Sequence, residues 1–311
     1  MAEQAALAFQ AVVGIVGICG NGLVCGVIAK VRFMHTLTNA FIFNQALVDL
    51  IGSLVILLQR FVPIPDPIPP GAIGVLLCAL WATKFLQWGP FTVSTFNLIA
   101  LTLERYLAIV FPFRYQTLAS RKKATAVLVG MWVAGFLFSV YSIYFRYYED
   151  GECVPNQVAH PRVIGVCVFF VKFFLPVSVM LVVYGHIMVV LKKGTGRIQP
   201  GPAAAGPSTE GQGESLMRAR RNTFKTLLIV CVAFIICWSP DQIFFFLFNI
   251  GVEVDFNSPV SYLFVGMVSL NCCLNPFIYA IKYKQFQKAL KVVFGKRGDR
   301  ASVATLSTGQ N

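Results

Sequence analysis

Seven long apolar runs constrain what this chain can fold into more than any other feature of its sequence. A run of about 18 or more apolar residues is long enough to cross a bilayer as a helix. Composition agrees, because 57% of the 311 residues are hydrophobic, 13% are charged and the mean hydropathy is +0.70. The sequence therefore predicts an all-α membrane protein, a seven-transmembrane helix bundle. The runs lie at roughly 5–29, 40–59, 73–103, 125–145, 163–191, 224–250 and 259–281.

The distribution of positive charge predicts the orientation of this bundle. With the N-terminus outside, most of the 26 Lys and Arg residues fall in the inner loops and the C-terminal tail, and the outer loops hold only Arg60, Arg146 and Arg162. We therefore expect a multi-pass plasma-membrane protein with an extracellular N-terminus. The net charge of +13 is mostly this topology signal, together with attraction to anionic inner-leaflet lipid, which argues against a nucleic-acid partner.

Composition also divides the chain. Residues 1–295 form the predicted seven-transmembrane domain, and residues 296–311 form a short cytoplasmic tail. Within the domain, residues 194–215 are rich in Gly, Pro, Ala and Ser and are predicted to be a disordered third inner loop. After the seventh span, apolar residues recur at intervals of three and four opposite lysines, which predicts a short amphipathic helix. Its apolar face would carry Tyr283, Phe286, Leu290 and Phe294, and its basic face Lys284, Lys288 and Lys291.

Seven of the nine cysteines lie in apolar runs, where a buried thiol behaves as a small hydrophobe. Cys78 and Cys153 are the two that fall on the oxidising outer face. One disulfide between the third span and the loop after the fourth is the economical interpretation, and two free thiols are the alternative.

Asp49 stands about halfway along the second span, where an ionisable side chain is costly to bury. Two interpretations follow from this position. The carboxyl could be neutral and hydrogen-bonded to a neighbouring helix. Alternatively, an ionised carboxylate would bind a cation or relay a proton.

A set of short motifs occurs one per span, in order, over nearly the whole chain. They are Asn21 in GNGLV, Asp49 in NQALVDL, the triplet Glu104-Arg105-Tyr106, Trp132, Pro176 with Tyr184, CWSP at 237–240 and NPFIY at 275–279. Any one motif arises easily by chance, but seven in the correct spans do not. With these motifs the chain resembles the rhodopsin-like (class A) G-protein-coupled receptors.

The resemblance implies an allosteric sodium ion, with no other cofactor, and oxygen ligands around a single carboxylate suit such an ion. It also implies a swing of the sixth span about Pro240, although a packing kink without motion is the alternative. The sodium ligands would be Asp49, Ser94, Asn271 and Asn275. Activation and G-protein coupling would use Glu104, Arg105, Tyr106, Tyr184, Phe234, Trp238, Pro240 and Tyr279.

Three departures from the family pattern are visible. Cys78 lies 27 residues before Arg105 rather than the usual 25, so we expect an altered start to the third span. Gln45 replaces the usual leucine before Asp49. Arg220 stands where many relatives place an acid that holds the arginine, so that latch to Arg105 is missing, although Glu104 could pair with Arg220 instead. Glu104 alone would then restrain Arg105 at the cytosolic interface, within reach of water, and we expect ligand-independent signalling.

Candidate ligand contacts lie in the outer half of the bundle. Amine receptors of this family place an aspartate where this chain has Gln87, which argues against an aminergic ligand. Lys172 and Asp241 are unusual charges on the fifth and sixth spans; they would either neutralise each other in a salt bridge or open to a zwitterionic or peptide ligand. An acidic outer face favours a basic neuropeptide, and lipid or small organic acids are the alternatives. The candidate ligand-binding residues are Lys84, Gln87, Lys172, Asp241 and Gln242.

The expected function is a cell-surface receptor that activates heterotrimeric G proteins, with arrestin and a receptor kinase as further partners. A channel or secondary transporter is the competing class, but the sequence shows no repeated half and no filter-like loop. An enzyme is not expected, because HExxH, GxSxG and paired catalytic aspartates are absent from the sequence.

Overall fold

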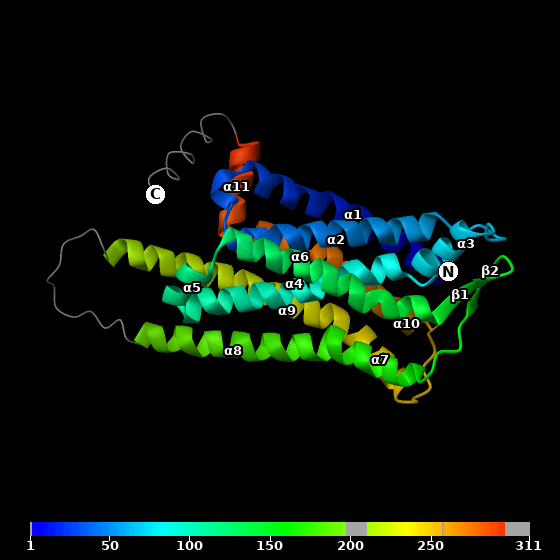
Figure 1. Ribbon diagram of the computed structural model, residues 1–311. Coiled ribbons are helices and arrows are strands. Elements are labelled where there is room, and N and C mark those ends of the chain that lie inside the picture. The colour runs from blue at the N-terminus through cyan, green and yellow to red at the C-terminus, as the bar shows by residue number, and fades with distance from the viewer. Residues whose placement is uncertain (1, 197–209, 257, 296–311) are drawn as a thin grey trace.

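The computed structural model describes residues 2–196, 210–256 and 258–295 and shows a single bundle of long helices (Figure 1). Within these residues, seven helical segments are long and apolar enough to cross a membrane. The predicted all-α fold is therefore confirmed. The long helices are α1 (Ala2–Lys30), α2 (Leu37–Phe61), α4 (Phe85–Val110), α6 (Arg121–Ser139), α7 (Pro161–Phe169) continuing into α8 (Leu175–Gly196), α9 (Glu210–Asn249) and α10 (Pro259–Lys282).

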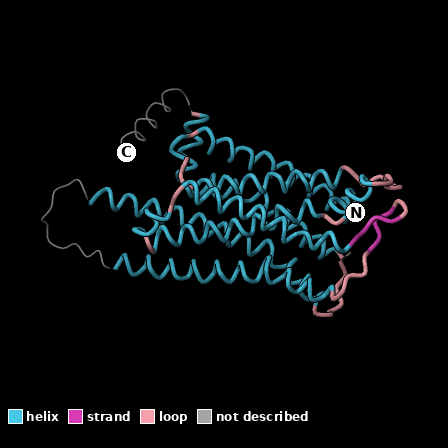
Figure 2. The backbone as a smooth tube through the Cα atoms, viewed as in Figure 1, coloured by secondary structure: helices cyan, strands magenta, loops and turns pink. Residues whose placement is uncertain are grey.

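Short elements cap the two ends of the bundle. The start of α1 lies at the same end as the hairpin of β1 (Arg146–Glu149) and β2 (Glu152–Pro155), the two magenta strands in Figure 2. The hairpin is antiparallel and pairs Tyr148 with Cys153. The opposite end holds α5 (Pro112–Leu118) and α11 (Lys284–Phe294), near η1 (Arg32–Met34). The end with the hairpin is called the outer end below, and the opposite end the inner end, after the orientation that the charge pattern predicts.

The predicted amphipathic helix after the seventh span is confirmed as α11. Its first turn packs inward, with Phe286 only 1% exposed and its ring 6.5 Å from that of Tyr279. The lysines Lys284, Lys288 and Lys291 are exposed on the other face. A helix with one apolar and one basic face is suited to lie along the inner surface of a membrane.

Small residues let α4 and α6 approach closely, which positions the centre of the bundle. A side chain at Gly89 would place its Cβ 2.5 Å from the ring of Phe136, so only glycine fits there. The hydroxyls of Thr92 and Ser139 hydrogen-bond across the same contact at 3.0 Å. Small residues and interhelical hydrogen bonds are the usual means of packing helices in lipid, where burial of apolar surface gives no driving force.

The third span begins irregularly, as the displaced cysteine predicts. Residues Ala72–Leu76 form α3, the next turn widens into a π-helical segment, η2 (Leu77–Ala82), and Lys84 then adopts a left-handed φ of 57° before α4 starts. A π-helical turn takes up extra residues per turn. The two additional residues between Cys78 and Arg105 are therefore absorbed in this segment, while α4 remains regular around the pair at its inner end.

The predicted disordered segment, 194–215, needs new boundaries. Helix α8 continues to Gly196, and α9 begins at Glu210, so both ends of the segment are helical. The remaining part, 197–209, lies outside the described residues, as does the predicted tail at 296–311. The side chain of Arg220, the alternative partner of Glu104, is also not described.

Candidate functional site

Glu104 and Arg105 form a bidentate ion pair at the inner end of α4. Nη2 of Arg105 lies 2.5 Å from Oε1 of Glu104, and Nε of Arg105 lies 2.6 Å from Oε2. Both residues are buried, with exposed fractions of 9% and 7%. The expectation that this pair is within reach of water is therefore wrong, because neighbouring elements cover it.

Two residues that the sequence did not single out complete this cluster. Thr38, at the start of α2, donates to Oε1 of Glu104 at 3.1 Å and accepts a hydrogen bond from Nη2 of Arg105. Tyr115, on α5, donates to the same carboxylate oxygen at 2.6 Å. Burial and the neighbouring Glu104 carboxylate raise the pKa of Tyr115, so its hydroxyl stays protonated and remains a donor. Glu104 therefore does not restrain Arg105 alone.

The three tyrosines expected to act in activation lie in different environments. Tyr106 hydrogen-bonds to Nδ1 of His186 at 2.9 Å. Tyr184 is buried, and its hydroxyl accepts from Thr102 at 3.5 Å rather than contacting Arg105. Tyr279 is fully buried, and within the described residues its hydroxyl has no hydrogen-bond partner. Arg105 thus stays with its acid, which is the arrangement expected of a receptor at rest.

An aromatic cluster lies in the C-terminal half of α9. The ring of Trp238 lies 5.5 Å from Phe91 of α4 in an edge-to-face contact, and 5.7 Å from Phe234 one turn earlier in the same helix. Pro240 follows two residues later inside the helix, where it removes a backbone hydrogen bond. Phe234, Trp238 and Pro240 thus lie within two turns of the same helix. Phe91 of α4 is a contact of Trp238 that the CWSP motif did not reveal.

Asp49 lies at the centre of the bundle and is 2% exposed. Its carboxylate accepts from Nδ2 of Asn275 at 2.8 Å and from the hydroxyl of Ser94 at 3.3 Å, so these predicted neighbours are in place. Asn271 is buried one turn before Asn275, but in the described part of the chain no hydrogen bond joins it to Asp49. Gln45 contacts both carboxylate oxygens at 3.2 Å.

Lys172 carries a buried ammonium group without a hydrogen-bond acceptor in the described structure. It lies in the π-helical segment η4 (Phe170–Phe174) between α7 and α8 and is 3% exposed. Its Nζ lies 4.7 Å from the ring centre of Trp88 and 5.6 Å from that of Tyr141. The two rings offer cation–π contacts, which stabilise a cation without supplying a counter-charge.

The salt bridge between Lys172 and Asp241, one of the two alternatives for this pair, is not formed in the described structure. Asp241 accepts instead from Nε2 of its neighbour Gln242 at 3.0 Å, and Oε1 of Gln242 is buried without a partner. Of the two alternatives for this pair, mutual neutralisation in a salt bridge is therefore wrong for the residues described here.

The other two ligand-binding candidates lie nearer the outer mouth. Gln87 is half-buried in the first turn of α4. Lys84 precedes that helix, and desolvation by the surrounding loops, together with the positive charges of Arg60 and Arg146, lowers its pKa. No hydrogen bond or ion pair in the described residues joins Lys84 or Gln87 to Lys172.

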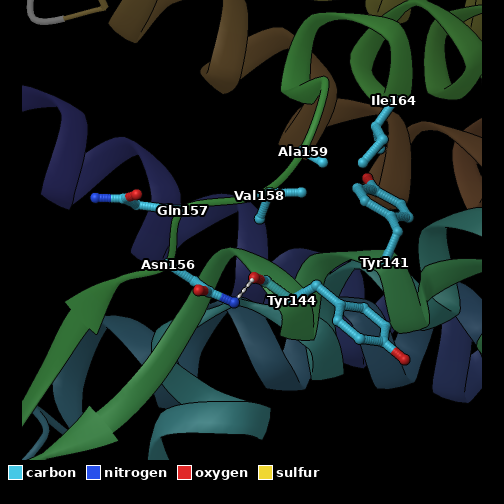
Figure 3. Close-up of a pocket in the computed structure, with 7 residues that line it drawn as sticks. All are labelled: Tyr141, Tyr144, Asn156, Gln157, Val158, Ala159 and Ile164. Atoms are coloured by element: carbon cyan, nitrogen blue, oxygen red, sulfur yellow. Dashed lines mark hydrogen bonds between the residues drawn. The ribbon is translucent and has the colours of Figure 1, made fainter.

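A pocket of about 370 Å³ lies at the outer end of the bundle (Figure 3). The side chains of Tyr141, from η3 (Val140–Phe145), and Ile164, from α7, face each other across one side of it. The opposite side is the chain that follows β2, where Nδ2 of Asn156 donates to the carbonyl of Tyr144 at 3.0 Å. Tyr141 is thus shared between this pocket and the surroundings of Lys172.

The disulfide between Cys78 and Cys153 is confirmed. It joins η2 to strand β2 with a Cα–Cα distance of 5.5 Å and holds the hairpin over the start of the third span. Backbone hydrogen bonds tie the same region to the first outer loop, since the amide of Ile68 donates to the carbonyl of Gly151 at 2.8 Å.

The residues that sequence reasoning missed are Thr38, Tyr115, Phe91, Trp88 and Tyr141. All five contact a predicted residue from another element, which helical periodicity along one element cannot show. Of the residues to which the resemblance to the receptor family pointed, Asp49, Ser94 and Asn275 do meet in space.

Comparisons with known proteins agree with this geometry. Residues 20–279 match the family model "7 transmembrane receptor (rhodopsin family)". Galanin receptor type 2 of Rattus norvegicus is 28% identical over 297 residues, which cover 92% of this chain and 74% of that protein. Galanin receptor 2a of Danio rerio is 30% identical over 90% of this chain and 75% of that protein. Neuromedin-U receptor 2 of Homo sapiens is 27% identical over 90% and 69%. Because the family model matches well over half of its length, this chain belongs to the rhodopsin family of seven-transmembrane receptors.

Proposed function

We propose that this receptor is activated by an extracellular peptide with an acidic group, which reaches Lys172 through the outer pocket. Membership of the family makes the chain a G-protein-coupled receptor, a multi-pass protein of the plasma membrane. A peptide ligand is favoured because the similar receptors from rat, zebrafish and human are receptors for galanin and neuromedin U.

The acidic group is inferred from the unpaired ammonium of Lys172. A buried charge without a counter-ion is costly, and a carboxylate arriving from the ligand would supply the missing partner. Trp88 and Tyr141 contact the ammonium from two sides, and Tyr141 also lines the outer pocket. Asp241 and Gln242 lie on α9, so a ligand held by Lys172 is placed to act on the helix that carries Trp238.

A small organic acid is the second candidate, for the same reason. The carboxylate of such a molecule would satisfy Lys172 as well as a peptide carboxylate would. The two candidates differ in what else they contact, since a peptide would extend over the hairpin β1–β2, whereas a small acid would be enclosed near Tyr141.

Further parts of the proposal concern topology and partners. The disulfide end of the bundle is proposed to face outward, since disulfides persist in oxidising compartments and the lysines of α11 then face the inner leaflet. An N-terminus on the outside follows, because the start of α1 lies at that end (Figure 1).

Arrestin and a receptor kinase are proposed as partners of the tail, which carries Ser302, Thr305, Ser307 and Thr308. We propose no catalytic activity.

The test is a ligand panel applied to cells that express the full chain. The panel contains galanin, neuromedin U, a tachykinin and a set of small carboxylic acids, and G-protein dissociation and arrestin recruitment are recorded against mock-transfected cells. The proposal expects a saturable response to a peptide, with reduced potency in Lys172→Ala. Responses to small acids and to none of the peptides would favour the second candidate. Whole-cell current without nucleotide exchange would contradict the G-protein-coupled function.

A further inference from the structure

Hydrogen-bond donors surround the carboxylate of Asp49, the residue where the family places a sodium ion. Asn275 and Ser94 each donate one hydrogen bond to it. Nε2 of Gln45 lies 3.2 Å from each carboxylate oxygen and also donates to Oγ of Ser94 at 2.5 Å. One amide group therefore contacts both Asp49 and Ser94, two of the residues that the family resemblance assigns to the ion.

The orientation of the Gln45 amide follows from a chain of hydrogen bonds that starts at α6. The indole N–H of Trp132 can only donate, and it donates to Oδ1 of Asn44 at 2.9 Å. Nδ2 of Asn44 then donates to Oδ1 of Asn97 at 3.1 Å. Nδ2 of Asn97 donates to Oε1 of Gln45 at 2.8 Å and to the backbone carbonyl of Phe41 at 3.0 Å.

Each hydrogen bond in this network can run in only one direction from donor to acceptor. A carbonyl can only accept, so Nδ2 of Asn97 must be the atom that faces both Phe41 and Gln45. Oxygen and nitrogen of an amide are assigned from such networks, and here both a donor-only group and an acceptor-only group fix the assignment. The nitrogen of Gln45 therefore points at Asp49 in any arrangement that keeps the network satisfied.

These contacts do not fit a sodium ion. Sodium is a hard cation that requires oxygen ligands, whereas Gln45 and Asn275 both direct N–H groups at the carboxylate. Oγ of Ser94 already accepts from Gln45. To admit the ion, Gln45 would have to rotate, which would set its nitrogen against the nitrogen of Asn97 and leave buried donors without acceptors.

We propose that the amide of Gln45 replaces the sodium ion, so that Asp49 is held by an internal donor and the resting state does not respond to sodium. The amide supplies partial positive charge at both carboxylate oxygens, which is the task of the cation in the family arrangement. The same network connects Asp49 to Trp132 on α6, so three helices share the contact. This inference is independent of the ligand class proposed above.

The test is thermal unfolding of the purified full chain in NaCl and in KCl at equal ionic strength. The wild-type midpoint should be the same in both salts. Gln45→Leu removes the amide and opens the site, so its midpoint should rise in NaCl but not in KCl. At a sodium concentration about tenfold above its Kd, mass action predicts a rise of about 3 °C or more.

Matched variants locate the effect at Asp49. The double variant Gln45→Leu/Asp49→Asn should lose the sodium-dependent rise, because the carboxylate is gone. Gln59→Leu removes a glutamine from the same helix without touching the network and should behave as the wild type. If Gln45→Leu does not fold, Gln45→Met keeps the length of the side chain without its hydrogen bonds.

Binding of radioactive ²²Na⁺ to membranes that contain the wild-type receptor provides a second readout. No saturable binding is expected in the wild type, and binding should appear in Gln45→Leu or Gln45→Met. A sodium-specific rise in the wild-type midpoint, or wild-type ²²Na⁺ binding that Asp49→Asn abolishes, would overturn the proposal. Absence of any sodium response in both Gln45 variants would overturn it equally, because the amide would then not be what excludes the ion.

Discussion

The hydroxyl of Tyr115 donates a 2.6 Å hydrogen bond to Oε1 of Glu104, which joins the loop helix α5 to the inner end of α4. Thr38 of α2 donates to the same oxygen. Glu104 in turn holds Arg105, so three elements meet at one carboxylate. Release of Arg105 from Glu104 would therefore disturb contacts with both α5 and α2.

Tyr115→Phe is expected to raise ligand-independent signalling above that of the wild type. The variant removes one hydrogen bond to a buried charged group, while Arg105 and Thr38 remain bound to Glu104. A loss of about 1 kcal/mol from the resting state would raise the ratio of active to resting receptor about fivefold. Basal nucleotide exchange per receptor at the cell surface measures this ratio.

Tyr144→Phe is the matched control, since Tyr144 is exposed at the outer end of the bundle. Its basal exchange should equal that of the wild type. Basal exchange of Tyr115→Phe at or below the wild-type level would show that α5 does not restrain the pair. Wild-type exchange equal to that of mock-transfected cells would contradict the expectation of ligand-independent signalling itself.

The features that could be predicted from the sequence are those set by long apolar runs and by spacing. The seven spans follow from the cost of exposing backbone polar groups to lipid, which forces each apolar run into a helix. The displaced Cys78 correctly indicated an irregular start of the third span, because two extra residues before Arg105 must be placed somewhere. The amphipathic helix after the seventh span followed from its period of three and four.

Contacts between elements could not be predicted in the same way. Lys172 and Asp241 have opposite charges on neighbouring helices, yet Lys172 packs against Trp88 and Asp241 binds Gln242. Which partner Lys172 contacts depends on the direction of its side chain, and the π-helical segment η4 sets that direction. Such a segment leaves no periodic signal in the sequence. Tyr115 was missed for a related reason: it belongs to a separate short helix, whose placement against α4 depends on the fold.

Removing either outer charge is expected to lower agonist potency. Lys172→Ala and Asp241→Ala should each shift the potency of the activating ligand at least tenfold, equivalent to about 1.4 kcal/mol, with receptor still present at the cell surface. The reason is that Lys172→Ala removes the bond to the ligand's acidic group, and Asp241→Ala removes the acidic side chain that α9 carries in the outer half of the bundle. Concentration–response curves for G-protein activation, normalised to surface receptor, give the shift.

Lys122→Ala provides the charge-matched control, because Lys122 is exposed at the start of α6 on the inner side. Its potency should be unchanged. Unchanged potency in both Lys172→Ala and Asp241→Ala would remove these residues from the ligand site.

Asn97→Leu is expected to destabilise the bundle. The amide of Asn97 bridges Asn44, Gln45 and the carbonyl of Phe41, so its loss leaves several buried polar groups without partners. The cost should be about 1–3 kcal/mol, lowering the unfolding midpoint by several degrees. Asn156→Ala, at an exposed position of the outer loop, should change the midpoint by no more than about 1 °C. Equal effects of the two variants would contradict the importance of the buried network.

Breaking the disulfide between Cys78 and Cys153 should reduce stability and surface expression. The bond closes a loop with a sequence separation of 75, and in the chain-entropy model a loop of that size is worth roughly 4 kcal/mol. Cys78→Ser, Cys153→Ser and the double variant should lose similar amounts, because each removes the same bond. Cys167→Ser changes an exposed free cysteine and should behave as the wild type. Unfolding midpoints and surface labelling measure the effect. Wild-type values in the single variants would show that the bond does not hold the hairpin over the third span. A double variant much less stable than either single variant would show the same.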